Sequence, residues 1–419
     1  MVTTRASGSF LRRALSPAAA LLALLLTADA QAQMSTVSQR GDNGIKVGAG
    51  RLHPLFGFET RFDSYVGLSE QGTSTGGVPD GTGDLILHIR PGLELEVPSD
   101  TIQLGARFLL DYNAYTGMTE AWTSDLSRTA ASFDLNALIN PKGKVQVGLD
   151  ERFARSDKIT NLELGALTLS NRNDAGINVS ILPGNGNLLI RPGYVNTYEH
   201  FEPRDGNPDP NVANHDYWQH NLGLNLGYKV LPESALVLDT SLAIRNYERT
   251  PSQQYDTQNL RVLGGFVGLV APRISLLAKA GYGQQLDSAG YDGFLAHAEL
   301  GYLYSAQTQV RLGYVRSFEP SPSAGLYYTD DRVYLDGSTR LGQKLRLNAG
   351  LSYDQINFPE LSSRGTEDQI GFHIGPDWEF NSFLTAGISY ALTSRTSART
   401  VGGLDYDRHE VGAHVMVYY

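Results

Sequence analysis

The sequence has 419 residues, no cysteine, 19% charged residues and a formal net charge of −10. The absence of cysteine excludes disulfide scaffolds, thiol catalysis and cysteine-ligated metal sites. The acidic balance argues against a nucleic-acid-binding protein, which would carry a basic patch. Charged residues are fewer than the roughly one quarter that is usual in soluble domains, whereas the 45 glycines and 22 tyrosines are many. This composition argues against a helical cytosolic enzyme.

Residues 1–32 are predicted to be a signal peptide. Three arginines among the first 13 residues form a positively charged start, residues 18–26 (AAALLALLL) form a short apolar stretch, and residues 30–32 (AQA) offer a cleavage site. The apolar stretch is shorter than the about 20 residues that a membrane-spanning helix needs. Twin-arginine export is an alternative to the general secretory route, but Ala-Leu follows Arg12-Arg13 where Phe-Leu is usual. Residues 33–54 are expected to be a short periplasmic segment.

From residue 55 to residue 419, apolar and polar side chains alternate over long stretches. Residues 84–97, for example, place Leu85 and Leu87 on one face and His88 and Arg90 on the other. A period of two residues indicates a β-strand, because successive side chains point to opposite faces of a sheet. Strands of soluble proteins average about five or six residues, whereas a tilted membrane-spanning strand needs about 9–11. The long alternation therefore favours membrane-spanning strands.

Eighteen such strands are predicted, with sixteen as the alternative number. The predicted spans are 55–68, 84–97, 101–115, 126–140, 144–154, 172–182, 187–198, 216–230, 235–247, 259–270, 274–283, 293–304, 309–318, 328–340, 345–355, 367–379, 383–394 and 408–419. Tight turns are predicted at 98–100, 140–143, 183–186, 231–234, 271–273, 305–308, 341–344 and 380–382. They alternate with longer polar stretches, such as 69–83 and 155–171. Short turns that alternate with long loops are typical of outer-membrane barrels.

Aromatic residues gather near both ends of these strands, as two interfacial girdles require. Those near the long stretches are Tyr112, Tyr198, Trp218, Tyr247, Tyr282 and Tyr353. Those near the short turns are Phe56, Tyr228, Tyr304, Trp378 and Phe383.

The predicted fold is all-β, a closed antiparallel transmembrane β-barrel in the bacterial outer membrane, spanning residues 55–419. An open sheet edge in lipid would leave unpaired backbone groups, each costing several kcal/mol, and closure removes every edge. The last strand alternates outward-facing valines and ends on the aromatic Tyr419. This ending resembles the C-terminal signal that the barrel assembly machinery reads, although Phe is the usual last residue. The expected surroundings are outer-membrane lipids and lipopolysaccharide.

Charged residues of both signs fall on the inward positions of the strands. A single-sign ladder would favour an ion-selective pore; a mixed wall favours a neutral or bulky hydrophilic passenger. The plainer interpretation is that these side chains pair across strands and solvate the wall. The inward Tyr65, Tyr115 and Tyr334 either stack on sugar rings or pack in the wall. The candidate lumen-lining residues are Glu59, Arg61, Asp63, His88, Arg90, Glu94, Arg107, Asp111, Arg152, Lys229, Arg245, Arg311, Arg332 and Arg346.

No catalytic, cofactor-binding or metal-binding residue is predicted. The sequence has nine histidines and many serines but no H-E-x-x-H zinc motif. His215-Asp216 and His409-Glu410 lie at strand ends and are interpreted as hydrogen-bonded rim residues. The chain is therefore expected not to be an enzyme.

Five segments resemble a known family. They are residues 56–60 (FGFET), 93–98 (LELEVP), 171–176 (NRNDAG), 191–194 (RPGY) and 228–234 (YKVLPES). The chain resembles the β-barrel porins found beside exopolysaccharide biosynthesis clusters, including the stand-alone polysaccharide-secretion barrels of myxobacteria. The resemblance covers most of the chain after residue 54 but rests on loose β patterns. It implies polymer export through the outer membrane with a periplasmic polysaccharide-export protein, and it supplies no site residues.

Four functions follow from these observations. The first is a conduit for polysaccharide secretion, which the mixed wall and the resemblance favour. The second is a diffusion or substrate-specific uptake porin for small hydrophilic solutes, the third an outer-membrane enzyme, and the fourth an adhesive surface barrel. Neither the passenger nor the oligomeric state follows from the sequence.

Overall fold

The computed structural model describes ten segments of the chain. They are residues 44–66, 82–119, 121–156, 168–203, 215–248, 256–287, 291–320, 327–358, 365–397 and 405–419. The predicted signal peptide (1–32) and residues 33–43 of the predicted periplasmic segment lie outside them. Within the described residues, no helix has the length and apolar character needed to cross a membrane.

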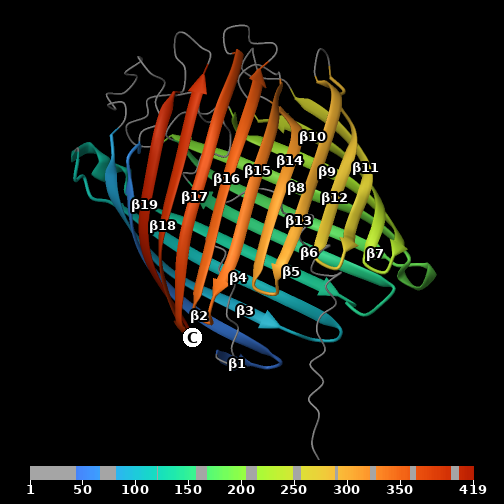
Figure 1. Ribbon diagram of the computed structural model, residues 1–419, viewed down its shortest axis with the longest axis horizontal. Coiled ribbons are helices and arrows are strands. Elements are labelled where there is room, and N and C mark those ends of the chain that lie inside the picture. Colours follow the sequence, from blue (N-terminus) through green and yellow to red (C-terminus); the bar gives the residue numbers. More distant parts are fainter. Residues whose placement is uncertain are drawn as a thin grey trace, which may run out of the picture. The chain divides into compact units, whose positions relative to one another are not determined.

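The described residues are almost entirely β-strand (Figure 1). The strands are β1 (Ile45–Val47), β2 (Gly50–Asp63), β3 (Asp84–Val97), β4 (Ile102–Tyr115), β5 (Arg128–Ile139), β6 (Val145–Ser156), β7 (Thr168–Ile181), β8 (Leu188–Pro203), β9 (Tyr217–Leu231), β10 (Ser234–Tyr247), β11 (Thr257–Ala271), β12 (Ile274–Gln285), β13 (Asp292–Ser305), β14 (Thr308–Pro320), β15 (Tyr327–Leu341), β16 (Leu345–Phe358), β17 (Gly365–Asn381), β18 (Leu384–Ser397) and β19 (Tyr406–Tyr418). Two short 3-10 helices, η1 (Ala121–Leu126) and η2 (Gly184–Gly186), complete the elements.

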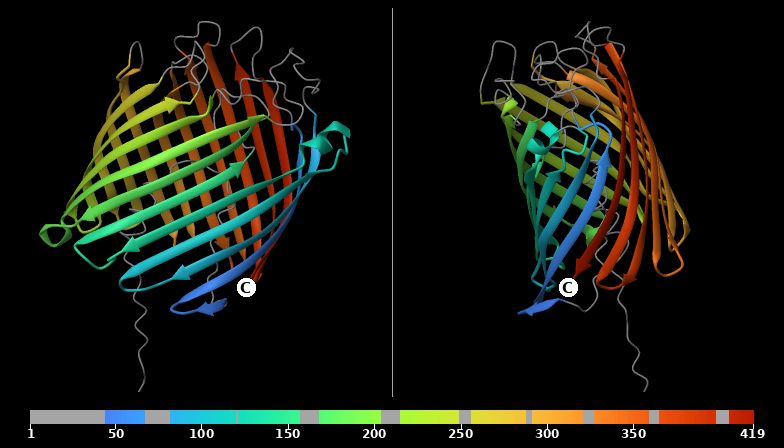
Figure 2. Two further views of the ribbon diagram at one scale, coloured as in Figure 1. Left: turned by 180° about the vertical axis from the view of Figure 1, so that it is seen from behind. Right: turned by 90° about the vertical axis from the view of Figure 1, so that its left-hand side faces the viewer.

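Each long strand pairs in antiparallel fashion with its neighbours in sequence, and β19 pairs with β2. Val411 of β19 lies opposite Phe62 of β2, and Val417 opposite Phe56. The sheet therefore closes on itself, as the two views of Figure 2 show. The 3-residue β1 only adds a small hairpin on β2, so the barrel has the 18 strands β2–β19. The prediction of a closed antiparallel barrel of eighteen strands is confirmed, and the alternative of sixteen is wrong.

The strand bounds follow the predicted spans, with shifts at strand ends. β3 has the predicted bounds, 84–97. β2 begins at Gly50 rather than at residue 55, because its first residues pair with β1 on one side and with β3 on the other. β6 continues to Ser156, and β7 begins at Thr168. Both strands therefore extend into the stretch 155–171, which the sequence predicts as a loop.

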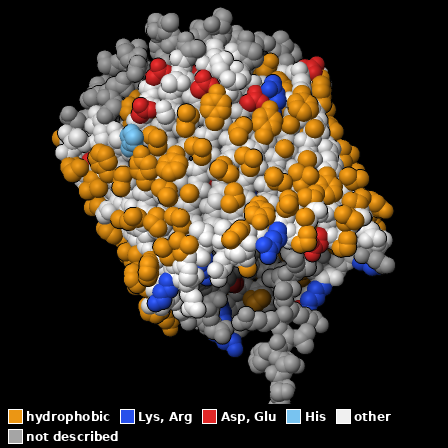
Figure 3. Space-filling model, in the orientation of Figure 1, with side chains coloured by type: hydrophobic (Ala, Val, Ile, Leu, Met, Phe, Trp, Pro, Cys, Tyr) orange, Lys and Arg blue, Asp and Glu red, His pale blue; other side chains and the backbone are white. Residues whose placement is uncertain are grey.

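The outer face of the barrel is apolar. Leu312 on β14 and Leu351 on β16 are each 50% exposed, and Figure 3 shows hydrophobic side chains spread over this face. Aromatic residues near the strand ends are exposed as well, among them Tyr112, Trp218, Tyr282, Tyr353, Phe56, Tyr228, Tyr304, Trp378 and Phe383. The assignment of Tyr247 to a girdle is wrong. Tyr247 lies opposite Tyr217, is only 8% exposed and packs edge-on against the Tyr217 ring.

Glycine allows close approach of β11 and β12. A Cβ atom on Gly281 would lie 1.8 Å from the Val262 carbonyl oxygen, and one on Gly265 would lie 2.0 Å from the Ala278 carbonyl oxygen. No side chain fits at such distances. Both glycines are therefore required by the backbone of the strand pair, and Gly265 is one of the glycines that obscure the alternation of 259–270 in the sequence.

Candidate functional site

The candidate site is the inner wall of the barrel. The pairing register places all fourteen predicted lumen-lining residues on the sheet face opposite the exposed apolar side chains. On β2, for instance, Glu59, Arg61 and Asp63 alternate with the outward Phe58 and Phe62. Their inward position follows from the period of two, because one register step would reverse every side chain.

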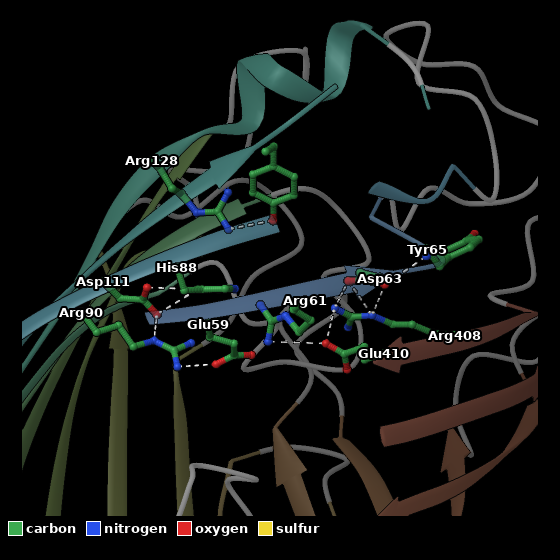
Figure 4. Close-up of polar contacts among 11 residues, drawn as sticks. Glu59, Arg61, Asp63, Tyr65, His88, Arg90, Asp111, Arg128, Arg408 and Glu410 are labelled. Carbon is green, nitrogen blue, oxygen red and sulfur yellow. Dashed lines mark hydrogen bonds and ion pairs between the residues drawn. The ribbon is translucent and has the colours of Figure 1, made fainter. Parts of the chain in front are cut away.

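The first group of contacts lies on β2, β3 and β4 (Figure 4). The Arg90 guanidinium pairs with the Glu59 carboxylate, and its Nε donates to Asp111 Oδ2 at 2.8 Å. His88 Nδ1 lies 3.0 Å from Asp111 Oδ1. His88 and Glu59 are only 1% and 6% exposed. Arg90 thus lies between two carboxylates, one of which also contacts His88, so groups of opposite charge are neighbours in this part of the wall.

The second group lies across the closing seam between β19 and β2 (Figure 4). Arg408 Nη2 donates to Asp63 Oδ2 at 2.6 Å, and its Nε donates to Asp63 Oδ1 at 3.0 Å. Arg61 Nη1 lies 3.6 Å from Glu410 Oε1, which Arg408 also approaches at 3.4 Å. Bidentate arginine–carboxylate pairs combine energy with a fixed geometry. These pairs therefore reinforce the strand pairing that closes the barrel.

The third group lies on β15 to β18. Arg332 pairs with Asp354, and Arg395 pairs with Glu367, whose side chains are 3% and 2% exposed. On the turn side, Glu379 accepts from Arg340 at 2.9 Å and from Arg346 at 2.7 Å.

The fourth group lies on β7 to β12. Lys279 Nζ lies 2.5 Å from Asp239 Oδ2, and Arg172 Nε donates to Asp174 Oδ2 at 2.9 Å. The Tyr217 hydroxyl donates to Glu199 at 2.6 Å, and the Arg245 guanidinium lies 4.1 Å from the centre of the Tyr217 ring. Pairs of opposite charge therefore occur on β2–β4, β7–β12 and β15–β19 of the inner wall.

Other predicted residues are less tightly held. Arg152 lies 3.2 Å from Asp134, with both side chains well exposed, and Arg311 lies 3.8 Å from Asp336. Lys229 is exposed, Glu94 is half-buried, and Arg107 has a buried Nε without a hydrogen-bond partner.

Large inner side chains are buried where the strands approach the long connections. We call these residues the loop-end belt. The belt consists of four clusters: Val66, Ile86, Tyr115 and Leu126; Phe201, Tyr217 and Tyr247; Tyr291, Leu295 and Phe318; Tyr328, Ile356 and Phe358. Farther toward the turns, Asp150, Arg152, Lys229 and His373 are exposed. Inner side chains are also buried toward the turn end, among them Leu55, Val267, Leu277 and Met416, so buried and exposed positions occur along the whole height of the inner wall.

Burial and side-chain contacts distinguish the two interpretations of the inward tyrosines. Tyr65 and Tyr115 are each 8% exposed. Tyr65 stacks on Tyr406 at 5.4 Å between ring centres, and Arg128 lies over the Tyr115 ring. Tyr334 donates its hydroxyl hydrogen to Glu299 at 2.6 Å. All three pack in the wall in this structure.

The rim residues make hydrogen bonds. Asp216 accepts from the Phe201 backbone N–H at 2.8 Å and lies 2.7 Å from His200 Nδ1. His409 Nδ1 lies 3.0 Å from the Tyr390 hydroxyl. Among the described residues, no group of three or more His, Asp or Glu residues could hold a metal ion. One G-x-S-x-G sequence, residues 72–76 (GTSTG), has the spacing of a hydrolase nucleophile motif and lies outside the described ranges.

Several residues of the network are missing from the predicted set. They are Glu367, Arg395 and Arg408, with Glu379 and Arg172. Glu367 and Arg408 are the first residues of predicted strands, and Arg395 directly follows one. Continuing the inward alternation to the strand ends would have found them.

The family profile described as Putative beta-barrel porin 2 matches residues 111–419. No curated protein matches the chain. Solved structures with a similar fold include OccAB3 of Acinetobacter baumannii (10% identity, 89% of this chain and 100% of that chain, TM-score 0.47). They also include the siderophore receptor PirA of Pseudomonas aeruginosa, with 10% identity, 87% of this chain and 80% of that chain covered, and a TM-score of 0.43. OmpT of Vibrio cholerae has 12% identity, 90% of this chain and 100% of that chain covered, and a TM-score of 0.41. These likenesses carry no functional argument. The family match covers most of the chain, and the protein belongs to the Putative beta-barrel porin 2 family.

Proposed function

We propose that this porin-family barrel is an outer-membrane channel through which a polysaccharide leaves the cell. The observation that supports it most is the charge-compensated inner wall. Arg90, Arg408 and Arg395 each contact a carboxylate, and Lys279 contacts Asp239. Paired charges leave little net field along a pore, whereas rings of one sign select ions. A wall of this kind offers hydrogen-bonding groups to a hydroxyl-rich polymer without repelling or trapping it by charge.

The size of the barrel fits the proposal. An eight-stranded barrel is filled by its own side chains, whereas barrels of about 16–18 strands leave an aqueous channel. The 18 strands of this chain place it among the barrels whose interior is too wide for the wall side chains alone to fill.

The position of the loop-end belt favours export over uptake. Inner side chains are packed in clusters at the loop end, where Phe318 and Ile356 are 0% exposed, whereas Asp150 and Lys229, farther toward the turns, are exposed. In outer-membrane barrels the short turns face the periplasm and the long loops face outward. In the proposed direction a passenger would enter at the turn end and leave past the side chains of the loop-end belt.

Partners follow from the same proposal. A periplasmic polysaccharide-export protein would deliver the polymer to the turn end, and lipids with lipopolysaccharide would surround the apolar face. The barrel assembly machinery would recognise the last strand, whose Tyr419 N–H donates to the Pro54 carbonyl at 3.0 Å. The proposed function needs no catalytic residue, cofactor or metal ion.

Deleting the gene tests the proposal. In cells that make a surface polysaccharide, deletion is expected to abolish surface polymer while intact polymer accumulates in the periplasm, and the wild-type gene should restore export. An unchanged amount of surface polymer, in cells without a second gene of this family, would contradict the proposal.

The second candidate is an uptake porin for small hydrophilic solutes, favoured by the exposed Asp150 and Arg152 on the inner wall. Liposomes that contain the purified protein separate the two functions. Rapid swelling in small sugars would favour uptake, because the packed loop end of an export channel should keep it nearly closed without its partner.

A further inference from the structure

The outer face of β5 to β8 carries a shallow, mostly apolar groove in the middle of the barrel wall, with a few polar side chains at its edges. The groove has a volume of about 380 Å³. At equivalent outward positions, other strands carry apolar residues, such as Leu238 on β10, Leu312 on β14 and Leu351 on β16. Its lining includes Leu135, Leu149, Glu151, Ile177, Tyr194 and Asn196.

Glu151 faces outward. It lies opposite Leu135 of β5 and Ala175 of β7, on the same face as the exposed Leu149 and Ile177. Among the described residues, its carboxylate has no hydrogen-bond or ion-pair partner. An ionised carboxylate on the lipid face of a barrel is unfavourable, most of all near the middle of the membrane. A neighbour that supplies a hydrogen-bond donor would remove this penalty.

The other edge of the groove carries donors. The Tyr194 hydroxyl lies 2.8 Å from His220 Nδ1, and Asn196 Nδ2 lies 3.2 Å from the same nitrogen. The Tyr194 and His220 rings stack with an angle of 14° between their planes. When the His220 ring carries its proton on Nδ1, it donates to Tyr194, and the tyrosine hydroxyl is then free to donate outward. The groove therefore has an acceptor at one edge and a donor at the other.

Both edges lie equally far along their strands from the turn end. Glu151 follows Val145, the first residue of β6, by six positions, and Tyr194 follows Leu188, the first residue of β8, by the same number. Val145 and Leu188 both begin their strands at the turn end. A two-fold axis along the membrane normal, passing between the two residues, would place Glu151 of each copy against Tyr194 of the other.

We propose that this groove is the interface of a symmetric dimer, with a second copy of this chain as its occupant. A two-fold interface must be complementary to itself. Here each Glu151 carboxylate accepts a hydrogen bond from the partner's Tyr194 hydroxyl, and the apolar side chains Leu135, Leu149 and Ile177 of both copies fill the hollow between them. The inference does not depend on what passes through the barrel.

Disulfide cross-linking tests this interface, because the chain has no cysteine of its own. Two differently tagged copies, one Glu151→Cys and the other Tyr194→Cys, would be produced together and oxidised in isolated membranes. A covalent dimer that contains both tags is expected, and neither variant alone should give one. Leu238→Cys with Leu351→Cys is the matched control on another part of the outer face, and should give no cross-link.

A filled groove provides the second arm. Ala175→Trp, placed between the two edges, should abolish the cross-link, whereas Ala298→Trp on the outer face of β13 should leave it unchanged. Folding of each variant is checked by the faster migration of unheated barrels in denaturing gels. Absence of the mixed cross-link in folded protein, an equal cross-link at the control sites, or a monomer whose groove retains a lipid in native mass spectrometry would overturn the proposal.

Discussion

Replacing Glu367 with alanine is expected to lower the free energy of unfolding by about 3–5 kcal/mol, the range for breaking a buried ion pair by removing one partner. The Glu367 and Arg395 side chains are 2% and 3% exposed, and Arg395 donates to Glu367 through both Nε and Nη2. Truncating the carboxylate leaves the guanidinium buried without its counter-charge. The measurement is equilibrium unfolding by urea in lipid vesicles, followed by tryptophan fluorescence.

Asp134→Ala is the matched control for Glu367→Ala. Asp134 also pairs with an arginine on the inner wall, but the Asp134 and Arg152 side chains are 38% and 56% exposed. Exposed ion pairs contribute about 1 kcal/mol or less, so this variant should unfold nearly as the wild type does. Equal decreases in the free energy of unfolding of the two variants would show that burial does not set the strength of the ion pairs on the inner wall.

A second large effect is expected from Gly281→Val on β12. The first side-chain atom would lie 1.8 Å from the Val262 carbonyl oxygen, which belongs to the paired strand β11. Overpacking in a well-packed region costs about 1–3 kcal/mol when side chains can shift, and more when backbone is in the way. We therefore expect β11 and β12 to separate and most of the protein to remain unassembled.

Gel migration of unheated samples measures the folded fraction of this variant. Gly105→Val on β4 is the control, since no atom lies within 4 Å of a Cβ atom at that position. A Gly281→Val protein that folds as completely as the Gly105→Val protein would contradict the close approach of the two strands.

Much of the fold follows from local rules that the sequence displays. The alternation of 84–97 gives both the bounds of β3 and its inward residues, and the proline-containing turns separate neighbouring strands. Closure follows because an open sheet edge in lipid would leave backbone N–H and C=O groups without hydrogen-bond partners. The inward position of Glu59, Arg61 and Asp63 follows from the same period of two.

Contacts at the strand ends and across the barrel do not follow from local rules. Tyr247 has the alternation of a strand but the surroundings of a packed cluster, because inner and outer positions both carry aromatics near the loops. The Arg408–Asp63 pair joins residues 345 positions apart, which only the closing register brings together. Glu151 faces outward by the same alternation that turns Arg152 inward, but its position beside Tyr194 depends on the register of β6, β7 and β8.

Single-channel recording with polymer on one side at a time tests the central claim most directly. The purified barrel would be inserted in a planar bilayer with known orientation, and surface polysaccharide from the producing cells would be added to either chamber. Because export proceeds from the turn end to the loop end, polymer added at the turn end is expected to interrupt the residual current. Polymer added at the loop end should not. Interruption from the loop end alone, or no interruption from either side while small sugars pass freely, would contradict export of a polysaccharide through this barrel.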